Sequence, residues 1–224
     1  MISKCYSRPE IRSKFHDGQV IMTGGFAFHG IPDVLMELVL ESGAKHLTVI
    51  ALDASCEILL HSGAVDKVIL AHAGAKKKNL ELLASGKIEV EFCPMGTIAE
   101  RMRAAGAGLG GILVKTGMGT VADHGQEHII VDGEEYMLET PLHADVALVR
   151  ASSSDLYGNL LYNGAARNSN PLVAMAGDLT IVQTDELRKL DTVPPENVVT
   201  PGIFTDMILD PQMVYRGGVP RDRS

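Results

Sequence analysis

The sequence predicts an α/β fold, in which an open, mostly parallel sheet is flanked by helices and accompanied by a small β-rich layer. Three observations support this prediction. Short apolar runs alternate with segments of helical periodicity, which favours parallel strands joined by right-handed crossovers. Hydrophobic residues make up 46% of the chain but aromatic residues only 4%, so the core is aliphatic, as in parallel β/α layers. An Asp-Gly pair at 132–133 separates two extended runs, which indicates a hairpin.

The first predicted unit is a strand, a glycine loop and a helix start. Four apolar or β-branched residues at 20–23 lead directly into paired glycines, and Pro32 then opens a segment of helical spacing. Proline suits the first turn of a helix because its missing N–H would have no intrahelical partner there. Gly43 is a typical C-terminal stop. The pattern therefore predicts a strand at 19–23 and a helix at 32–42.

The same alternation continues along the chain. Strands are predicted at 47–52, 65–71 and 88–93, and helices at 77–85 and 97–105. In the second of these helices, Thr97 and Glu100 have the spacing of a capping box, so Thr97 is the expected N-cap.

The second half of the chain is less regular. The glycine-rich segment 106–120 favours irregular backbone near a site or an interface. After a hairpin at 128–139, two buried strands are expected at 144–151 and 179–184. We interpret residues 1–224 as a single domain, with a flexible, polar tail from about 211.

The polar segment 155–171, between those two strands, is rich in asparagine. Asparagine side chains bind nearby backbone groups and tolerate left-handed conformations, which favours a structured loop. Alternatively, Arg167 organises a subunit interface or orients a carboxylate through two parallel hydrogen bonds.

Composition limits the classes of function. A formal net charge of −8 and a pI near 5.4 argue against a nucleic-acid or anionic-membrane partner and favour a small-molecule role. The chain lacks the roughly eighteen consecutive apolar residues of a membrane span, and its first residues carry charges, so a cytoplasmic location is expected. The three cysteines have no C-x-x-C spacing and the histidines no H-E-x-x-H spacing, so no metal site is expected.

The glycine loop is the strongest candidate site. Without a Cβ, its backbone amides can approach a ligand closely at a helix N-terminus, which suits an anionic or carbonyl oxygen. His29 lies inside the loop, where it could contact a substrate carboxylate. The alternative is a tight turn without a ligand, since the spacing is not the G-x-G-x-x-G of a dinucleotide site.

The stretch from Asp17 to Pro32 resembles a known family signature. It reads D-G, an apolar run, then G-G-F-x-x-x-G-x-P, and closely matches family I CoA-transferase α subunits, as in the acetate/acetoacetate and succinyl-CoA:3-oxoacid enzymes. The resemblance extends over about two hundred residues, through motifs at 94–97, 99–111, 116–120, 144–151, 158–162, 166–171 and 200–202.

This resemblance implies an open α/β chain that encloses an active site with a β subunit of similar fold. The implied reaction moves CoA from an acyl-CoA to a free carboxylic acid through a glutamyl-CoA thioester. In the family the glutamate belongs to the β subunit, in an E-N-G type motif that is absent from this sequence. The resemblance therefore implies no catalytic residue in this chain and no cofactor other than the CoA thioester substrate.

The resemblance also indicates which residues bind substrate. The expected set consists of Gly24, Gly25, Phe26, Ala27, Phe28, His29 and Gly30 in the loop, and Asp53, Met95 and Gly96 around the acyl group.

Two positions depart from the family pattern. Met95 replaces the glutamine of P-Q-G-T and cannot donate a hydrogen bond, and Leu52-Asp53 replaces an Asn pair or Asn-Asp. These changes favour a more apolar acyl group, a different acceptor, or altered chemistry such as hydrolysis. The alternative functions are a CoA-thioester hydrolase or lyase subunit, or a non-catalytic binding or scaffolding subunit.

Overall fold

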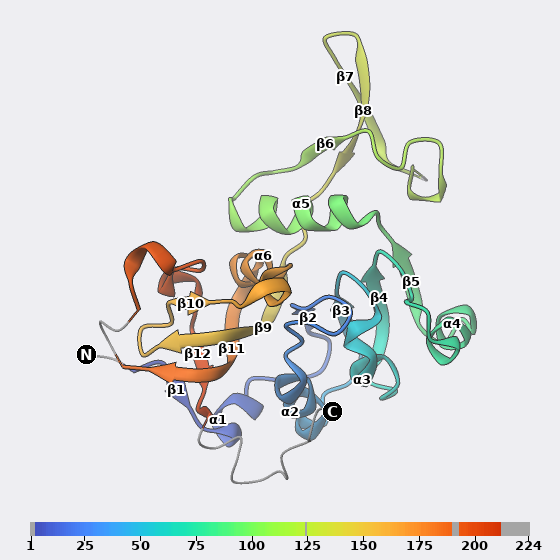
Figure 1. Cartoon of the computed structure of the whole chain (residues 1–224). Coiled ribbons are helices and arrows are strands. Elements are labelled where there is room, and N and C mark those ends of the chain that lie inside the picture. Colours follow the sequence, from blue (N-terminus) through green and yellow to red (C-terminus); the bar gives the residue numbers. More distant parts are fainter. Residues whose placement is uncertain (1–2, 124, 190–192, 212–224) are drawn as a thin grey trace.

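The computed structural model describes residues 3–123, 125–189 and 193–211, and within them the chain forms one large sheet and one small sheet (Figure 1). The strands of the large sheet are β1 (Cys5–Tyr6), β2 (Val20–Thr23), β3 (Leu47–Ile50), β4 (Val65–Leu70), β5 (Glu89–Phe92), β9 (Ala144–Asp155), β10 (Leu160–Leu161), β11 (Gly177–Arg188) and β12 (Met207–Leu209). Their order is β1-β12-β11-β9-β2-β3-β4-β5, and β10 pairs with β9. Every pairing is parallel except that of β10 with β9.

The strand order reverses direction beside β2. From β2 the chain moves outward through β3, β4 and β5, and then returns to place β9 on the opposite side of β2. In open α/β sheets, ligands bind beyond the carboxyl ends of the strands at such a reversal point. The segments that follow β2 and β9 therefore occupy the position where a site is expected.

Helices cover both faces of the large sheet. The helices are α1 (Arg8–Arg12), α2 (Asp33–Ser42), α3 (Glu57–Leu60), α4 (Lys77–Ala84), α5 (Met95–Gly106) and α6 (Asn170–Ala176). Short 3₁₀ helices lie at Ala54–Cys56, Val121–Asp123, Gly164–Arg167, Pro195–Asn197 and Gly202–Phe204. Helices α1 to α4 pack on one face, and α5 and α6 pack on the other.

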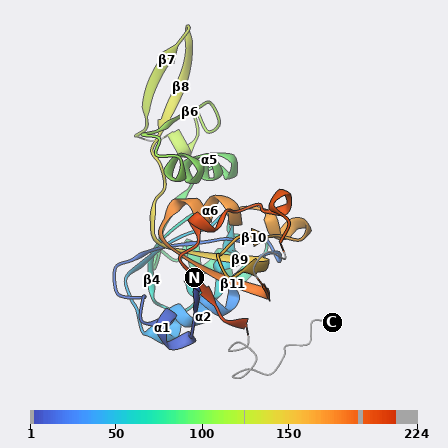
Figure 2. The ribbon, with the colours of Figure 1, turned by 90° about the vertical axis from the view of Figure 1, so that its left-hand side faces the viewer.

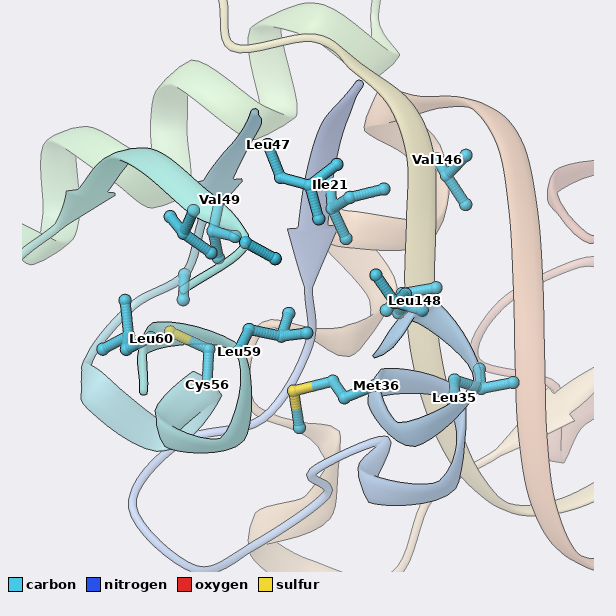
Figure 3. Packing of buried hydrophobic residues seen from close by; sticks show 14 of the residues in the cluster. Ile21, Leu35, Met36, Leu47, Val49, Cys56, Leu59, Leu60, Val146 and Leu148 are labelled. Carbon is cyan, nitrogen blue, oxygen red and sulfur yellow. The ribbon is translucent and has the colours of Figure 1, made fainter. Parts of the chain in front are cut away.

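Alternation along the strands divides the core between the two faces. Ile21 belongs to the cluster on the α1 to α4 face, whereas its neighbour Met22 belongs to the cluster on the α5 and α6 face. Figure 3 shows Leu35 and Met36 of α2 beside Leu148 of the sheet, with Leu59 and Leu60 of α3 close by. The two clusters hold the carboxyl ends of the strands in a fixed arrangement.

The small sheet forms an arm that projects from the large one. Its strands are β6 (Ile112–Val114), β7 (Glu127–Val131) and β8 (Glu134–Glu139), in the order β6-β8-β7 and all antiparallel. Figures 1 and 2 show that α5 lies between this arm and the large sheet. The hairpin turn at Asp132 and Gly133 has positive φ at both residues, 53° and 81°, as the Asp-Gly pair predicts.

The predicted fold class is confirmed, but several element boundaries differ. The capping-box prediction for Thr97 is wrong, because α5 begins two residues earlier with Pro94 as N-cap and Thr97 is buried in the first turn. The predicted strands at 144–151 and 179–184 are longer, extending to Asp155 and to Gly177–Arg188.

The predictions for the Asn-rich segment and for the tail compare differently with the structure. The segment 155–171 contains the predicted structured loop, but it also contains the end of β9, the strand β10, a 3₁₀ helix and the start of α6, which the sequence did not indicate. The predicted flexible tail lies, from residue 212 on, outside the described residues. In the part of the chain that is described, no helix is long and apolar enough to cross a membrane.

Candidate active site

The glycine loop, residues 24–30, leaves the large sheet at the reversal point. Gly24 N donates to Leu148 O at 2.8 Å, which holds the start of the loop against β9. Phe26 and His29 then exchange backbone hydrogen bonds, each 3.0 Å long, so that Ala27 and Phe28 form the tip of a tight turn. Phe28 is 78% exposed at this tip, and His29 is also exposed. The contact of His29 with a substrate carboxylate stays a prediction.

Asp53 supports this turn from the β3 side. Its side chain is buried, and Oδ2 accepts a hydrogen bond from Ala27 N at 3.0 Å while Oδ1 accepts one from Ser55 N, also at 3.0 Å. Ala27 has φ +54°, a left-handed conformation that is strained for alanine. Both carboxylate oxygens are thus engaged with backbone, and Asp53 fixes the turn.

The Asn-rich segment supports the loop from the β9 side. Asn168 Nδ2 donates to His29 O at 3.0 Å, and Asn170 Nδ2 donates to Gly30 O at 3.0 Å. Ser169 Oγ reaches Gly25 O at 3.4 Å. The loop is therefore held on two sides by segments far away in the sequence. Of these supporting residues, only Asp53 was in the predicted site.

The loop also carries backbone donors without protein partners. Within the described ranges, the N–H groups of Gly25, Phe28 and Gly30 have no hydrogen-bond acceptor, whereas those of Gly24, Phe26, Ala27 and His29 do. Gly25 is buried, and the Oγ1 of Thr23, the last residue of β2, is buried without a partner. Unpartnered buried donors are costly unless a ligand or water satisfies them.

A cavity of about 710 Å³ opens beside the loop. Its walls come from the tip of the glycine loop, from α2, from the 3₁₀ helix and α3 that follow β3, and from the connection between β4 and α4. The lining residues include Phe26, Ala27, Phe28, Ile31, Met36, Asp53, Ile58, His61, His72, Lys76 and Lys78. Phe26 meets the His72 ring edge to face, with the ring centroids 6.2 Å apart.

The cavity gathers only part of the predicted set. Phe26, Ala27, Phe28 and Asp53 line it, whereas Gly24, Gly25, His29 and Gly30 do not, and neither do Met95 and Gly96. Those two residues open α5 on the opposite face of the sheet, where Met95 is half-buried against the core and Gly96 is exposed. No sequence signal indicated the contributions of α2, α3 and the connection between β4 and α4, because these residues meet only through the fold.

Two lysines and a glutamate mark the rim of the cavity. Glu57 accepts hydrogen bonds from Lys76 Nζ, at 2.7 Å, and from Lys78 Nζ. These bonds lower the pKa of Glu57 from 4.5 to about 2. Deeper in the wall, His61 Nε2 lies 2.8 Å from Asn79 Oδ1. Ion pairs at the rim thus link Glu57 in α3 to Lys76 and Lys78 at the start of α4.

Replacing Glu57 with glutamine is expected to reduce stability at neutral pH more than at acid pH. Because its pKa is lowered on folding from 4.5 to about 2, the ionised carboxylate stabilises the fold above pH 4.5. This contribution is lost as the pH falls from 4.5 towards 2. Urea unfolding midpoints of the wild type and Glu57→Gln are compared at pH 7 and at pH 3.5. The difference in midpoint between the two proteins should be smaller at pH 3.5. The same difference in midpoint at both pH values would contradict a stabilising role of the ionised Glu57. The control is Glu100→Gln, which removes an exposed ion pair with Arg103.

The thiols of the two buried cysteines resist ionisation. Burial raises the pKa of the Cys56 thiol to about 12, so its nucleophilic thiolate is scarce at neutral pH. Burial also raises the pKa of Cys93. Across the described ranges, no group of three or more His, Cys, Asp or Glu side chains is arranged to hold a metal ion.

A doubly wound sheet with a glycine loop and a cavity at its carboxyl edge is the arrangement in which open α/β proteins generally bind small molecules. Residues 9–210 match the family model described as Coenzyme A transferase. The chain belongs to the coenzyme A transferase family, as the sequence signature predicts.

Curated relatives specify the type of chain within the family. The chain is 42% identical over 214 residues to the alpha subunit of acetate CoA-transferase from Escherichia coli (strain K12), covering 93% of this chain and 97% of that protein. It is 38% identical over 214 residues to the alpha subunit of the acetoacetyl-CoA:acetate/butyrate CoA transferase of Clostridium acetobutylicum, covering 93% and 98%. The chain is therefore a CoA-transferase subunit of the α type, and the prediction of a transferase enzyme subunit is confirmed.

Solved structures share the fold at lower sequence identity. Glutaconate coenzyme A-transferase from Acidaminococcus fermentans matches with a TM-score of 0.83 and 21% identity, over 95% of this chain and 77% of that one. The acyl-CoA transferase YdiF from Escherichia coli O157:H7 matches with a TM-score of 0.79 and 20% identity, over 94% of this chain. This chain spans about half of YdiF, 47% of its length.

Proposed function

We propose that this chain pairs with a β subunit carrying the nucleophilic glutamate, and that the two transfer CoA from an acyl-CoA to a free carboxylic acid through a glutamyl-CoA thioester. The relatives named as alpha subunits support the partner. The absence of an E-N-G motif from this sequence supports the location of the glutamate. The CoA thioester is the substrate, and the proposal includes no other cofactor and a cytoplasmic location.

The observation that carries this proposal is the set of unpartnered N–H groups in the glycine loop. When a carboxylate attacks a thioester, negative charge develops on the carbonyl oxygen. Preorganised backbone donors stabilise such an oxyanion, and removal of one donor typically costs ~3 kcal/mol. We assign this role to the N–H of Gly25, together with that of Phe28 or Gly30.

The cavity beside the loop suits the acyl portion of the substrate. Phe26, Phe28 and Ile31 give it an apolar wall next to the loop, and Met36 and Ile58 continue that wall on α2 and α3. An apolar acyl group placed there would leave water and pack against these side chains. Short or medium acyl and 3-oxoacyl groups are the proposed range.

Reconstitution with the β subunit tests this function. The complex should transfer CoA from a panel of acyl-CoAs to acetate, succinate or acetoacetate, and borohydride or hydroxylamine should trap the thioester on the partner's glutamate. Release of CoA without any acceptor acid would instead indicate a hydrolase. A complex that binds acyl-CoA but yields neither transfer nor a trapped thioester would contradict the transferase.

A scaffolding role predicts a different response to mutation. Gly25 has φ +102°, which L side chains rarely adopt, and a Cβ added there would lie 3.0 Å from Ile31 Cα, so Gly25→Val is expected to strain and displace the loop. Turnover of the complex should fall if the loop acts in catalysis. Unchanged turnover would support a scaffold.

A further inference from the structure

Asn170 connects three segments around the glycine loop. Its side chain is completely buried, and Nδ2 donates to Gly30 O at 3.0 Å and to Ala166 O at 2.9 Å. Its Oδ1 accepts a hydrogen bond from Arg150 N, in β9, at 2.9 Å. The amide thus uses both donors and its acceptor on backbone groups. These bonds link the loop to β9 and to the 3₁₀ helix at Gly164–Arg167.

The same amide occupies the space beside both ends of the loop. A Cβ added to Gly24 would lie 1.9 Å from Asn170 Oδ1, and a Cβ added to Gly30 would lie 2.6 Å from Asn170 Nδ2. Gly30 also has φ +67°, but Gly24 does not have positive φ. Glycine at position 24 is therefore required by Asn170 and not by the local backbone conformation.

We infer that Asn170 is a positioning residue, which bonds the Gly30 end of the glycine loop, packs against its Gly24 end and so fixes the position of the unpartnered N–H of Gly25 between them. The inference rests on the proposed function in one respect, namely that the N–H of Gly25 stabilises the oxyanion of the reacting thioester. Asn170 itself is buried behind the loop and does not line the cavity. Its effect on the reaction passes through the loop backbone.

The chemistry of an amide makes this role specific. Aspartate has nearly the same shape as asparagine and keeps an acceptor for Arg150 N, but it cannot donate. In Asn170→Asp, a carboxylate oxygen would face the carbonyl oxygens of Gly30 and Ala166, which repel it. Gly30 O would then lose its hydrogen bond from Asn170, leaving Asn168 as the remaining side-chain donor to this end of the loop, while the side-chain volume stays the same. A displacement of about 1 Å in a positioned group can cost roughly 100-fold in rate.

The test compares Asn170→Asp with Asn163→Asp in the complex with the β subunit. Asn163 is exposed in the same segment and makes no side-chain capping hydrogen bond, so it is the matched control. Asn170→Asp should lower kcat by roughly 100-fold and change KM for the acyl-CoA by less than about threefold. Asn163→Asp should behave as the wild type. Equal kcat values for Asn170→Asp and the wild type would overturn the inference.

Hydrogen exchange separates this inference from the proposed function. In the isolated chain, Asn170→Asp should speed amide exchange at residues 24–30 and leave exchange in β4 unchanged. This readout requires no transferase activity. If the wild-type complex transfers no CoA, the proposed function fails, while exchange in the loop still decides whether Asn170 holds it. Unchanged loop exchange, or exchange that rises equally in β4, would overturn the positioning role.

A double-mutant cycle gives an independent test if Asn170→Asp does not fold. Asn170→Ala removes the atoms that a Cβ at Gly24 would meet. Gly24→Ala should therefore raise loop exchange strongly in the wild type but add little in the Asn170→Ala background. Additive effects would mean that Gly24 and Asn170 act separately, which contradicts the inference.

Discussion

Replacing Gly30 with alanine is expected to lower kcat/KM of the reconstituted enzyme by at least about 100-fold, because the end of the glycine loop must move. The new Cβ would lie 2.6 Å from Asn170 Nδ2 and 2.7 Å from Ala166 O, and φ at this position is +67°. The Ala166 atom belongs to the backbone, so a side-chain rotation alone cannot relieve the overlap. Steady-state kinetics with acyl-CoA and acceptor acid measure the effect.

The control for this prediction is Gly43→Ala. Gly43 ends α2 in the left-handed region, with φ +82°, but a Cβ added there would meet no atom within 4 Å. This variant carries the backbone strain alone, about 1 kcal/mol, away from the site. We expect it to lower the melting temperature slightly and to keep full activity. A similar loss of activity in both variants would contradict the steric explanation for Gly30.

Replacing Arg101 with methionine is expected to reduce the free energy of unfolding by ~3–5 kcal/mol, since it strands a buried carboxylate. Arg101 lies on α5, and its Nη1 is 3.5 Å from Glu139 Oε2 in β8 and 3.1 Å from Glu91 Oε1. Its Nε donates to Thr140 O at 2.7 Å. Only 3% of the Glu139 side chain is exposed. Urea unfolding at pH 7 measures the loss.

The double variant Arg101→Met with Glu139→Met should recover much of that stability, because it leaves no buried charge.

The pH dependence of stability gives a second check. Burial raises the pKa of Glu139 above 4.5, so the cost of ionising it in the folded chain appears as the pH rises through that raised value. Without Arg101, ionising the buried Glu139 costs more free energy. The difference in free energy of unfolding between Arg101→Met and the wild type should therefore be smallest below pH 4.5. A gap that widens in acid would contradict this account.

The parts of the site that sequence could predict are local. Val20–Thr23, the paired glycines and Pro32 follow one another directly, and local propensity was enough to identify a strand, a loop and a helix start. The helix α2 begins one residue later than predicted, because Pro32 is the N-cap and not a first-turn residue. The Asp-Gly hairpin was also identified, since its turn depends on two adjacent residues.

The parts that sequence could not predict depend on tertiary contacts. Asn170 and Gly30 are 140 residues apart, and no local pattern connects them. One signal was available, because Asn170-Pro171 precedes an apolar run and proline is common at the start of a helix. It would have identified α6, although not its contact with the loop. Asp53 was predicted to line the acyl pocket, whereas only the fold reveals that its oxygens hold Ala27 and Ser55.

The pairing of β1 with β12 has a consequence for the order of folding during synthesis. Lys4 Nζ donates to Gly202 O and Thr205 O, both at 2.6 Å, across 198 and 201 residues of chain. The central strand β2 likewise has one edge unpaired until β9 is synthesised, more than a hundred residues later. High contact order of this kind slows folding and leaves strand edges open on the nascent chain. We expect ribosome-bound chains that stop before residue 200 to depend on chaperones, and the large sheet to be completed only after β12 has been synthesised.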